Sequence, residues 1–249
     1  MTRQVTRQLI EIGPSGYTIH RISHVNLSSF LVYGPGGAFL VDPGNRGYHI
    51  KILETMDELG LEPQLLRLVI LTHVHFDHAG AASALRERTG CRIVVHRSEE
   101  ERLRQGFTPV PGGTRWKARV LVVLGRLVPR LIMSFPGTEP DILSGEEMSL
   151  EPYGFPGRLI HTPGHTPGSQ VILMESGDLI AGDTMVGLPG RALFPAFAED
   201  SATLLRSWEL IRSLPVRIIY PAHGVSVTFD RFREEYQQAI RKYGGKSRE

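Results

Sequence analysis

Histidines and aspartates stand in this chain at the spacing of a metal site. The apolar run 68–71 is followed directly by the densest group, Thr72-His73-Val74-His75-Phe76-Asp77-His78. Further candidate ligands come later, each in a short loop that contains Gly or Pro: His165, Asp183 and His223. Each loop follows a strand-like run, so each side chain is expected just beyond the carboxyl end of a strand, where sheet-based enzymes assemble their sites.

The spacing of the first group suggests how it would bind metal. A strand points alternate side chains to the same side, so His73 and His75 can reach one ion as the strand ends. The chain is then expected to turn into a helix at Asp77-His78, where this pair can face a second ion. A lone histidine is more often a hydrogen-bonded core or surface group, but an ordered run with three later partners favours metal.

The types of ligand indicate which metal and how many ions. Imidazoles combined with carboxylates suit zinc, with iron or manganese as alternatives. The candidate ligands are too many for one tetrahedral ion and fit two ions that share a bridging ligand. We therefore predict two divalent metal ions, with Zn²⁺ favoured.

These motifs resemble those of the metallo-β-lactamase superfamily. The resemblance covers nearly the whole chain, through five ordered motifs from Leu40-Val41-Asp42-Pro43-Gly44 to Pro221-Ala222-His223-Gly224. It implies that the first ion is held by His73, His75 and His165. It implies that the second is held by Asp77, His78 and His223, and that Asp183 bridges the two ions.

Asp42 matches the early aspartate of that superfamily. The resemblance implies a supporting residue near the metals rather than a ligand. The alternative is a turn residue that closes a strand before Pro-Gly, and the sequence leaves both interpretations open.

The pattern of elements predicts an α/β fold. Strand-like runs fall near 17–22, 28–33, 38–41, 66–71, 92–96, 157–161, 169–174, 178–182 and 216–220. Helical patterns fall near 46–59, 79–89, 201–213 and 229–243. Two β-rich halves with helices outside indicate a four-layer αβ/βα sandwich with the metals at one edge, which the resemblance also implies. No linker separates the halves, so a single domain over 1–249 is expected.

The stretch 98–150 departs from a minimal version of this fold. A helix is expected to start in the charged run 98–102. A loop rich in Pro and Gly follows, and 115–132 then places arginines opposite Trp116 and several leucines. Three interpretations remain open for 115–132: a helix over ordinary core, a lid that lines the substrate cleft, and a homodimer or membrane-surface contact.

Composition narrows the class of protein. The formal net charge of +2 is too small to indicate a nucleic-acid partner. Cys91 is the single cysteine, so an intrachain disulfide is excluded and a cytoplasmic setting is favoured. We expect no signal peptide, because the first residues lead into no long apolar stretch, and no apolar run in the sequence is long enough to span a membrane.

A pair of metal ions indicates hydrolysis. Two divalent ions about 4 Å apart lower the pKa of a bridging water enough to supply hydroxide near neutral pH. A serine nucleophile is then unnecessary, and the Gly-x-Ser-x-Gly motif is absent from the sequence. Asp77 is the candidate catalytic residue, because it can orient the hydroxide or take its proton. We predict hydrolysis of a small-molecule ester, thioester or lactone.

Other members of the same fold remain alternatives. Glyoxalase II-like thioesterases share these motifs but usually carry a helical C-terminal extension, whereas about one helix follows His223 here. An iron-dependent redox enzyme similar to sulfur dioxygenases is a second alternative, which metal content would separate. A phosphodiesterase or nuclease would share the ligands, but a nuclease is expected to show a basic groove.

Overall fold

The computed structural model describes residues 9–12, 16–25, 27–110, 112–114, 122–123 and 133–244. Trp116 and most of the segment 115–132 lie outside the described residues. The three interpretations of that segment therefore stay predictions.

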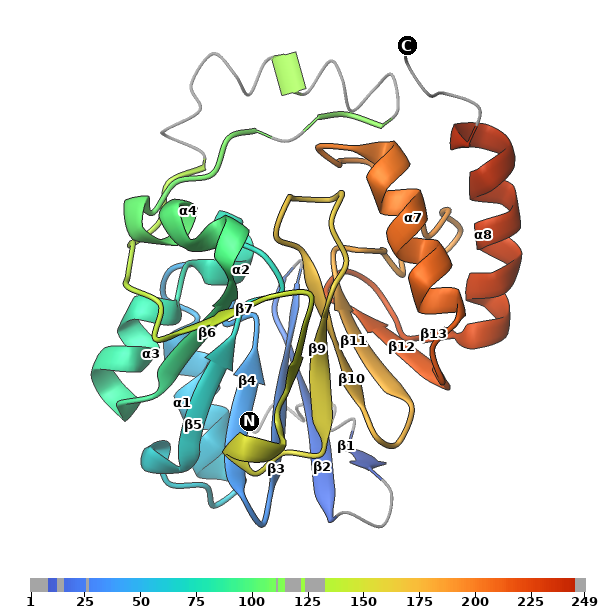
Figure 1. The fold of residues 1–249 in the computed structure, drawn as a ribbon. Coiled ribbons are helices and arrows are strands. Elements are labelled where there is room, and N and C mark those ends of the chain that lie inside the picture. The colour runs from blue at the N-terminus through green and yellow to red at the C-terminus, as the bar shows by residue number, and fades with distance from the viewer. Residues whose placement is uncertain are drawn as a thin grey trace.

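Two β-sheets occupy the centre of the molecule (Figure 1). Along the described chain, the first sheet follows the order β1-β2-β3-β4-β5-β6-β7 and the second the order β13-β12-β11-β10-β9-β8. The strands of the first sheet are β1 (Leu9–Ile12), β2 (Tyr17–Ser23), β3 (Ser28–Gly34), β4 (Gly37–Val41), β5 (Leu66–Ile70), β6 (Arg92–His96) and β7 (Ile142–Ser144). Those of the second are β8 (Glu147–Ser149), β9 (Gly157–His161), β10 (Gln170–Met174), β11 (Asp178–Gly182), β12 (Ile218–Pro221) and β13 (Val227–Thr228).

Helices cover the outer face of each sheet (Figure 1). Those beside the first sheet are α1 (His49–Glu58), α2 (Phe76–Ala79), α3 (Ala82–Thr89) and α4 (Glu100–Gln105). The second sheet carries α7 (Ser201–Arg212) and α8 (Phe229–Tyr243). The pairs β4–β5, β5–β6 and β11–β12 are parallel, and the helices α1, α3 and α7 lie in the connections that parallel pairs require.

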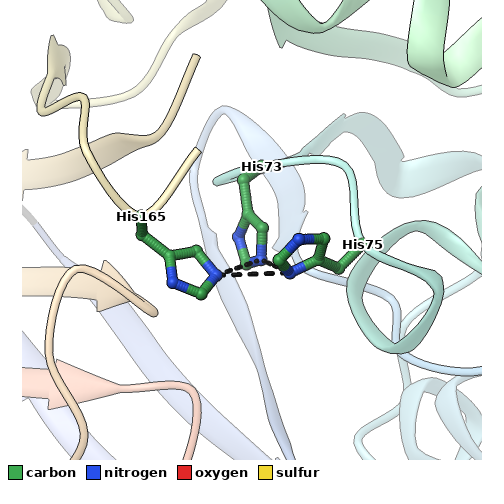
Figure 2. A group of neighbouring side chains, drawn as sticks. All are labelled: His73, His75 and His165. Atoms are coloured by element: carbon green, nitrogen blue, oxygen red, sulfur yellow. Dashed lines mark hydrogen bonds between the residues drawn. The ribbon is translucent and has the colours of Figure 1, made fainter. Parts of the chain in front are cut away.

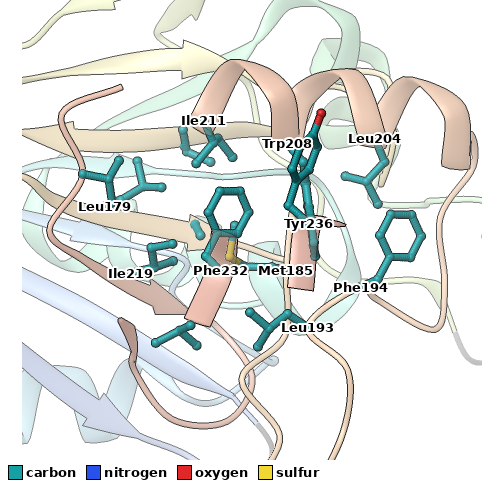
Figure 3. Packing of buried hydrophobic residues seen from close by; sticks show 14 of the residues in the cluster. Leu179, Met185, Leu193, Phe194, Leu204, Trp208, Ile211, Ile219, Phe232 and Tyr236 are labelled. Atoms are coloured by element: carbon teal, nitrogen blue, oxygen red, sulfur yellow. The ribbon is translucent and has the colours of Figure 1, made fainter. Parts of the chain in front are cut away.

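The apolar side chains form three layers between these elements. In β4, Phe39 and Val41 face the core between the sheets, whereas Ala38 and Leu40 face the core under the helices of the first half. This alternation follows from the two-residue period of a strand. Figure 3 shows the third layer, where Trp208 of α7 lies among side chains that include Phe232 of α8 and strand residues of the second sheet.

The layer order is thus helix, sheet, sheet, helix, and the predicted α/β sandwich is confirmed. The predicted strands near 17–22, 28–33 and 38–41 are present as β2, β3 and β4. The single helix expected near 79–89 is two helices in the structure. The first, α2, begins earlier, at Phe76, and the chain bends before the second, α3. The strands β1, β7, β8 and β13 were not predicted, because segments of two to four residues carry almost no periodic signal.

The end of the stretch 98–150 contributes to both sheets. Strand β7 pairs with β6 in the first sheet, and β8 pairs with β9 in the second. The extent of the domain and of its insertion stays a prediction. Among the described residues, none of the helices combines the length and the apolar character needed to cross a membrane.

Candidate metal centre

Three imidazoles converge where the two sheets meet at one edge. His73 and His75 lie in the loop after β5, and His165 lies in the loop between β9 and β10. Figure 2 shows the three rings pointing toward one another. His73 Nε2 lies 2.9 Å from His75 Nδ1, and His165 Nε2 lies 3.2 Å from each of these atoms.

The spacing and protonation of these rings fit a metal ion. Two nitrogens on one tetrahedral zinc, with bonds of about 2.0–2.1 Å, are separated by about 3.3 Å, which is close to the observed distances. Burial lowers the pKa of His73, His75 and His165, and neighbouring imidazoles lower those of His73 and His75 further. All three rings are therefore neutral near pH 7 and have lone pairs available for an ion.

A second group lies beside the first. It contains Asp77 and His78, which are in α2, and His223, which follows β12. Asp77 Oδ2 lies 3.6 Å from His223 Nε2 and 4.0 Å from His78 Nε2. These distances are too long for hydrogen bonds but short enough for ligands of one ion. His78 Nε2 is buried and has no hydrogen-bond partner among the described residues, as expected for a ligand atom.

Asp183 joins the two groups. Its Oδ1 lies 3.4 Å from His223 Nε2 and 3.6 Å from His78 Nε2. Its Oδ2 lies 3.6 Å from His165 Nε2. Burial alone would raise the pKa of Asp183, but the charges of His223 and His78 hold it well below its usual range. The residue is thus an anion with one oxygen toward each group.

Asp42 holds His78 in place. It lies directly after β4, and its Oδ2 is 2.9 Å from His78 Nδ1. Its carboxylate also accepts hydrogen bonds from the backbone N–H and the hydroxyl of Thr72, at 2.8 and 2.7 Å. A carboxylate on one ring nitrogen fixes the tautomer and directs the other nitrogen toward a metal. Asp42 adopts a φ of 52°, a left-handed conformation that few residues other than glycine take.

His165 is oriented in the same way by a backbone carbonyl. Its Nδ1 lies 3.0 Å from Phe197 O, so its Nε2 faces His73. The loops of the two sheets also approach closely at Gly182, where a Cβ atom would lie 2.3 Å from Thr72 Oγ1. Glycine before Asp183 thus allows the second sheet to bring its carboxylate beside the first.

All seven predicted ligands lie in this cluster, and Asp42 contacts it through His78. Their assignment as ligands stays a prediction. His96 and His161, which lack the ordered spacing in the sequence, stack on each other and belong to none of the ligand groups in the described chain. Sequence reasoning missed Glu99, which is fully buried beside the histidine loops. It stands in a run of acidic residues that looks like an exposed helix start, so no sequence signal distinguishes it.

Burial differs between the two groups. His73, His75 and His165 are at most 5% exposed. In contrast, the side chains of Asp77 and His223 are 24% and 19% exposed. Solvent therefore reaches the cluster from the side of Asp77 and His223.

The pKa values of the histidines determine how the folding stability of the metal-free protein depends on pH. Burial alone would lower the pKa of His78, but the charges of Asp42 and Asp183 raise it to about 9. The folded chain keeps this proton between pH 6.5 and 9, whereas the unfolded chain loses it, so stability falls as the pH rises through this range. Histidines with lowered pKa values act oppositely, because below pH 6.5 they bind protons preferentially in the unfolded chain; besides His73, His75 and His165 these are His24 and His96.

We therefore expect the chelator-treated protein to be most stable near pH 6.5. Denaturant unfolding at pH 5.5, 6.5 and 9 measures this. In a His78→Gln variant, the loss of stability between pH 6.5 and 9 should disappear. Equal stability of the unsubstituted protein at pH 6.5 and 9 would contradict the charge state assigned to His78.

Comparisons with known proteins identify the family. Residues 25–223 match the model of the metallo-beta-lactamase superfamily. A probable metallo-hydrolase of Methanocaldococcus jannaschii is 30% identical over 202 residues, which cover 79% of this chain and 87% of the relative. A hydroxyacylglutathione hydrolase of Haemophilus influenzae is 29% identical over 77% of this chain and 82% of its own length. A beta-lactamase structure from Chitinophaga pinensis superposes with a TM-score of 0.66 at 20% identity, covering 95% of this chain and 91% of that chain. With the fold and the histidine–aspartate cluster described above, these matches show that the chain belongs to the metallo-β-lactamase superfamily and is a metal-dependent hydrolase.

Proposed function

We propose that this protein hydrolyses a small-molecule ester, thioester or lactone with two divalent metal ions, of which zinc is favoured. His73, His75 and His165 would hold one ion, and Asp77, His78 and His223 the other. When bound, such a pair polarises the substrate oxygen and lowers the pKa of a coordinated water to near neutral.

One observation carries the proposal. The carboxylate of Asp183 has one oxygen near His165 and the other near His78 and His223, at 3.4–3.6 Å. A carboxylate in this position suits two adjacent ions better than one. The separations of 3.6 Å to His165 and His78 are longer than ordinary hydrogen bonds, so these side chains are spaced as co-ligands of Asp183.

Asp77 would be the residue that takes the proton of the attacking water. It is the most exposed side chain of the second group, and its Oδ2 lies within 4.0 Å of both His78 and His223. A carboxylate here can accept a hydrogen bond from the attacking water and hold its proton during the attack. His223, which is also partly exposed, borders the same approach.

The comparisons support the ester or thioester class without fixing the substrate. The relative from Haemophilus influenzae is named a hydroxyacylglutathione hydrolase. The similarity to beta-lactamase structures is at 20% identity and supports the fold alone.

A substrate panel tests the proposal. The zinc-loaded protein should hydrolyse a hydroxyacylglutathione thioester, an acyl lactone or a simple aryl ester, and a chelator should abolish the activity. The same preparation should leave a phosphodiester intact. Controls are the chelated protein restored with zinc and a His75→Ala variant. Turnover of a persulfide with consumption of oxygen, seen only with iron, would replace the hydrolase by the redox alternative.

A further inference from the structure

Glu99 is a buried carboxylate between two of the loops that carry the histidines. Its side chain is 0% exposed. Its Oε2 accepts a hydrogen bond from Val74 N at 3.2 Å, and its Oε1 accepts one from Gly168 N at 3.0 Å. Val74 belongs to the loop after the first-sheet strand β5, and Gly168 to the loop between strands β9 and β10 of the second sheet. One side chain thus joins the two halves of the fold beside the His73, His75 and His165 group.

The Val74 contact lies between two predicted ligands. Val74 separates His73 from His75, and its side chain is buried in the core. Its N–H donates to Glu99, and its carbonyl accepts a hydrogen bond from the buried hydroxyl of Thr108. Both polar backbone groups of this residue are therefore satisfied by side chains from the stretch that follows β6. The path of the backbone between the two ligands depends on these contacts.

The Gly168 contact requires the absence of a side chain. A Cβ atom at this position would lie 2.4 Å from Glu99 Cγ. Gly168 stands three residues after His165, so the close approach of Glu99 also sets the position of the His165 loop. Sequence inspection shows this glycine only as part of a Pro-Gly turn.

Arg102 lies beside the buried carboxylate of Glu99 and connects it to Glu199. Its guanidinium lies 3.5 Å from Glu99 Oε1 and donates to both carboxylate oxygens of Glu199, at 2.7 and 3.1 Å. The backbone N–H of Glu199 in turn donates to His165 O at 3.0 Å. A buried carboxylate is costly unless it is paired and hydrogen-bonded, and here it is both.

We propose that Glu99 is a positioning residue that sets the separation between the His73/His75 loop and the His165 loop, and so controls the affinity of the first metal ion. The inference rests on the ligand assignment of the proposed function. A merely structural ion pair would have a different signature, since its loss would destabilise the whole fold and weaken both ions together.

Glu99→Gln tests this role with little change of shape. An amide offers one acceptor oxygen, so either Val74 N or Gly168 N loses its partner and faces an NH₂ group. We expect the affinity of the first ion to fall about 10- to 100-fold, the effect usual for residues that orient metal ligands. The affinity of the second ion should stay within about twofold. Glu101→Gln is the matched control, because Glu101 lies close by in the first turn of α4, is exposed and contacts Gln105.

The measurement is a titration of the metal-free protein with Co²⁺ and Zn²⁺ against a chromophoric chelator. His75→Ala and His223→Ala identify the cobalt absorption that belongs to each ion. The first-ion absorption should change in Glu99→Gln and stay unchanged in Glu101→Gln. Thr108→Val, which removes the donor to the Val74 carbonyl, is a second variant and should weaken the same ion.

The outcomes separate the two hypotheses. Unchanged affinities and cobalt spectra in Glu99→Gln and Thr108→Val, with two ions bound by the unsubstituted protein, would overturn the positioning role alone. An equal loss of both ions, accompanied by a lower unfolding midpoint of the metal-free variants, would overturn it in favour of a structural ion pair. Full metal binding by His75→Ala would overturn the ligand assignment and the positioning role together.

Discussion

An Asp183→Ala variant is expected to lose both metal ions and nearly all hydrolytic activity. The carboxylate lies between the two groups, with one oxygen toward His165 and the other toward His78 and His223. If Asp183 bridges the ions as predicted, its removal takes a ligand from each ion and leaves His78, His165 and His223 without the anion beside them. Elemental analysis after dialysis should find close to two transition-metal ions per chain in the unsubstituted protein and well under one in the variant. The value of kcat/KM should fall on the order of 10³-fold.

Asp230→Ala provides the matched control. Its side chain is 91% exposed on α8, so the same substitution there should leave the metal content and the rate unchanged. Loss of one ion only from Asp183→Ala would assign that carboxylate to a single site. Full occupancy of both sites would show that the bridging assignment is wrong.

The second large effect is expected at Asp77 and His78. In Asp77→Asn or His78→Ala, kcat should fall on the order of 10²-fold or more, as for the loss of a principal charge-stabilising group. KM for substrates with an apolar acyl chain should change much less, because neither residue is expected to contact that part of the substrate. Steady-state kinetics on the zinc-loaded variants measures both quantities.

The same variants separate hydrolysis from iron-dependent redox chemistry. If the first three histidines carried a single catalytic iron, His78→Ala would still consume oxygen with a persulfide substrate. Zinc- and iron-loaded preparations should therefore be assayed side by side, with the metal content of each determined. Wild-type hydrolysis with zinc, together with its loss in His78→Ala, is the expected result.

The parts of the fold that were predictable have strong local patterns. Strands β3 and β4 bury side chains in two cores, so they stand out in the sequence as continuous apolar runs, 30–32 and 38–41. The ligand candidates were predictable because histidines and aspartates follow strand ends in a fixed order that resembles the motifs of the metallo-β-lactamase superfamily. Figure 1 shows the corresponding loops at one edge of the two sheets.

The parts that were not predictable depend on contacts between distant residues. Glu99 looks like one of several carboxylates at an exposed helix start, and its partner Gly168 is 69 residues away. The strands β7 and β8 are three residues each and exist because they pair with β6 and β9. Such features come from tertiary packing, which local propensity does not contain.

Because the predicted ligands come from both sheets, bound metal would affect how the protein unfolds. Asp77 and the first histidines come from the first half of the chain, whereas His165, Asp183 and His223 come from the second. An ion held by both halves is a cross-link that must be released before the sheets can separate. By mass action, metal at a hundred times its dissociation constant would add about 2.7 kcal/mol to the free energy of unfolding for each such ion. The concentration of free metal would thus control the fraction of chains that are unfolded and open to proteases. It would do so in addition to controlling the rate of catalysis.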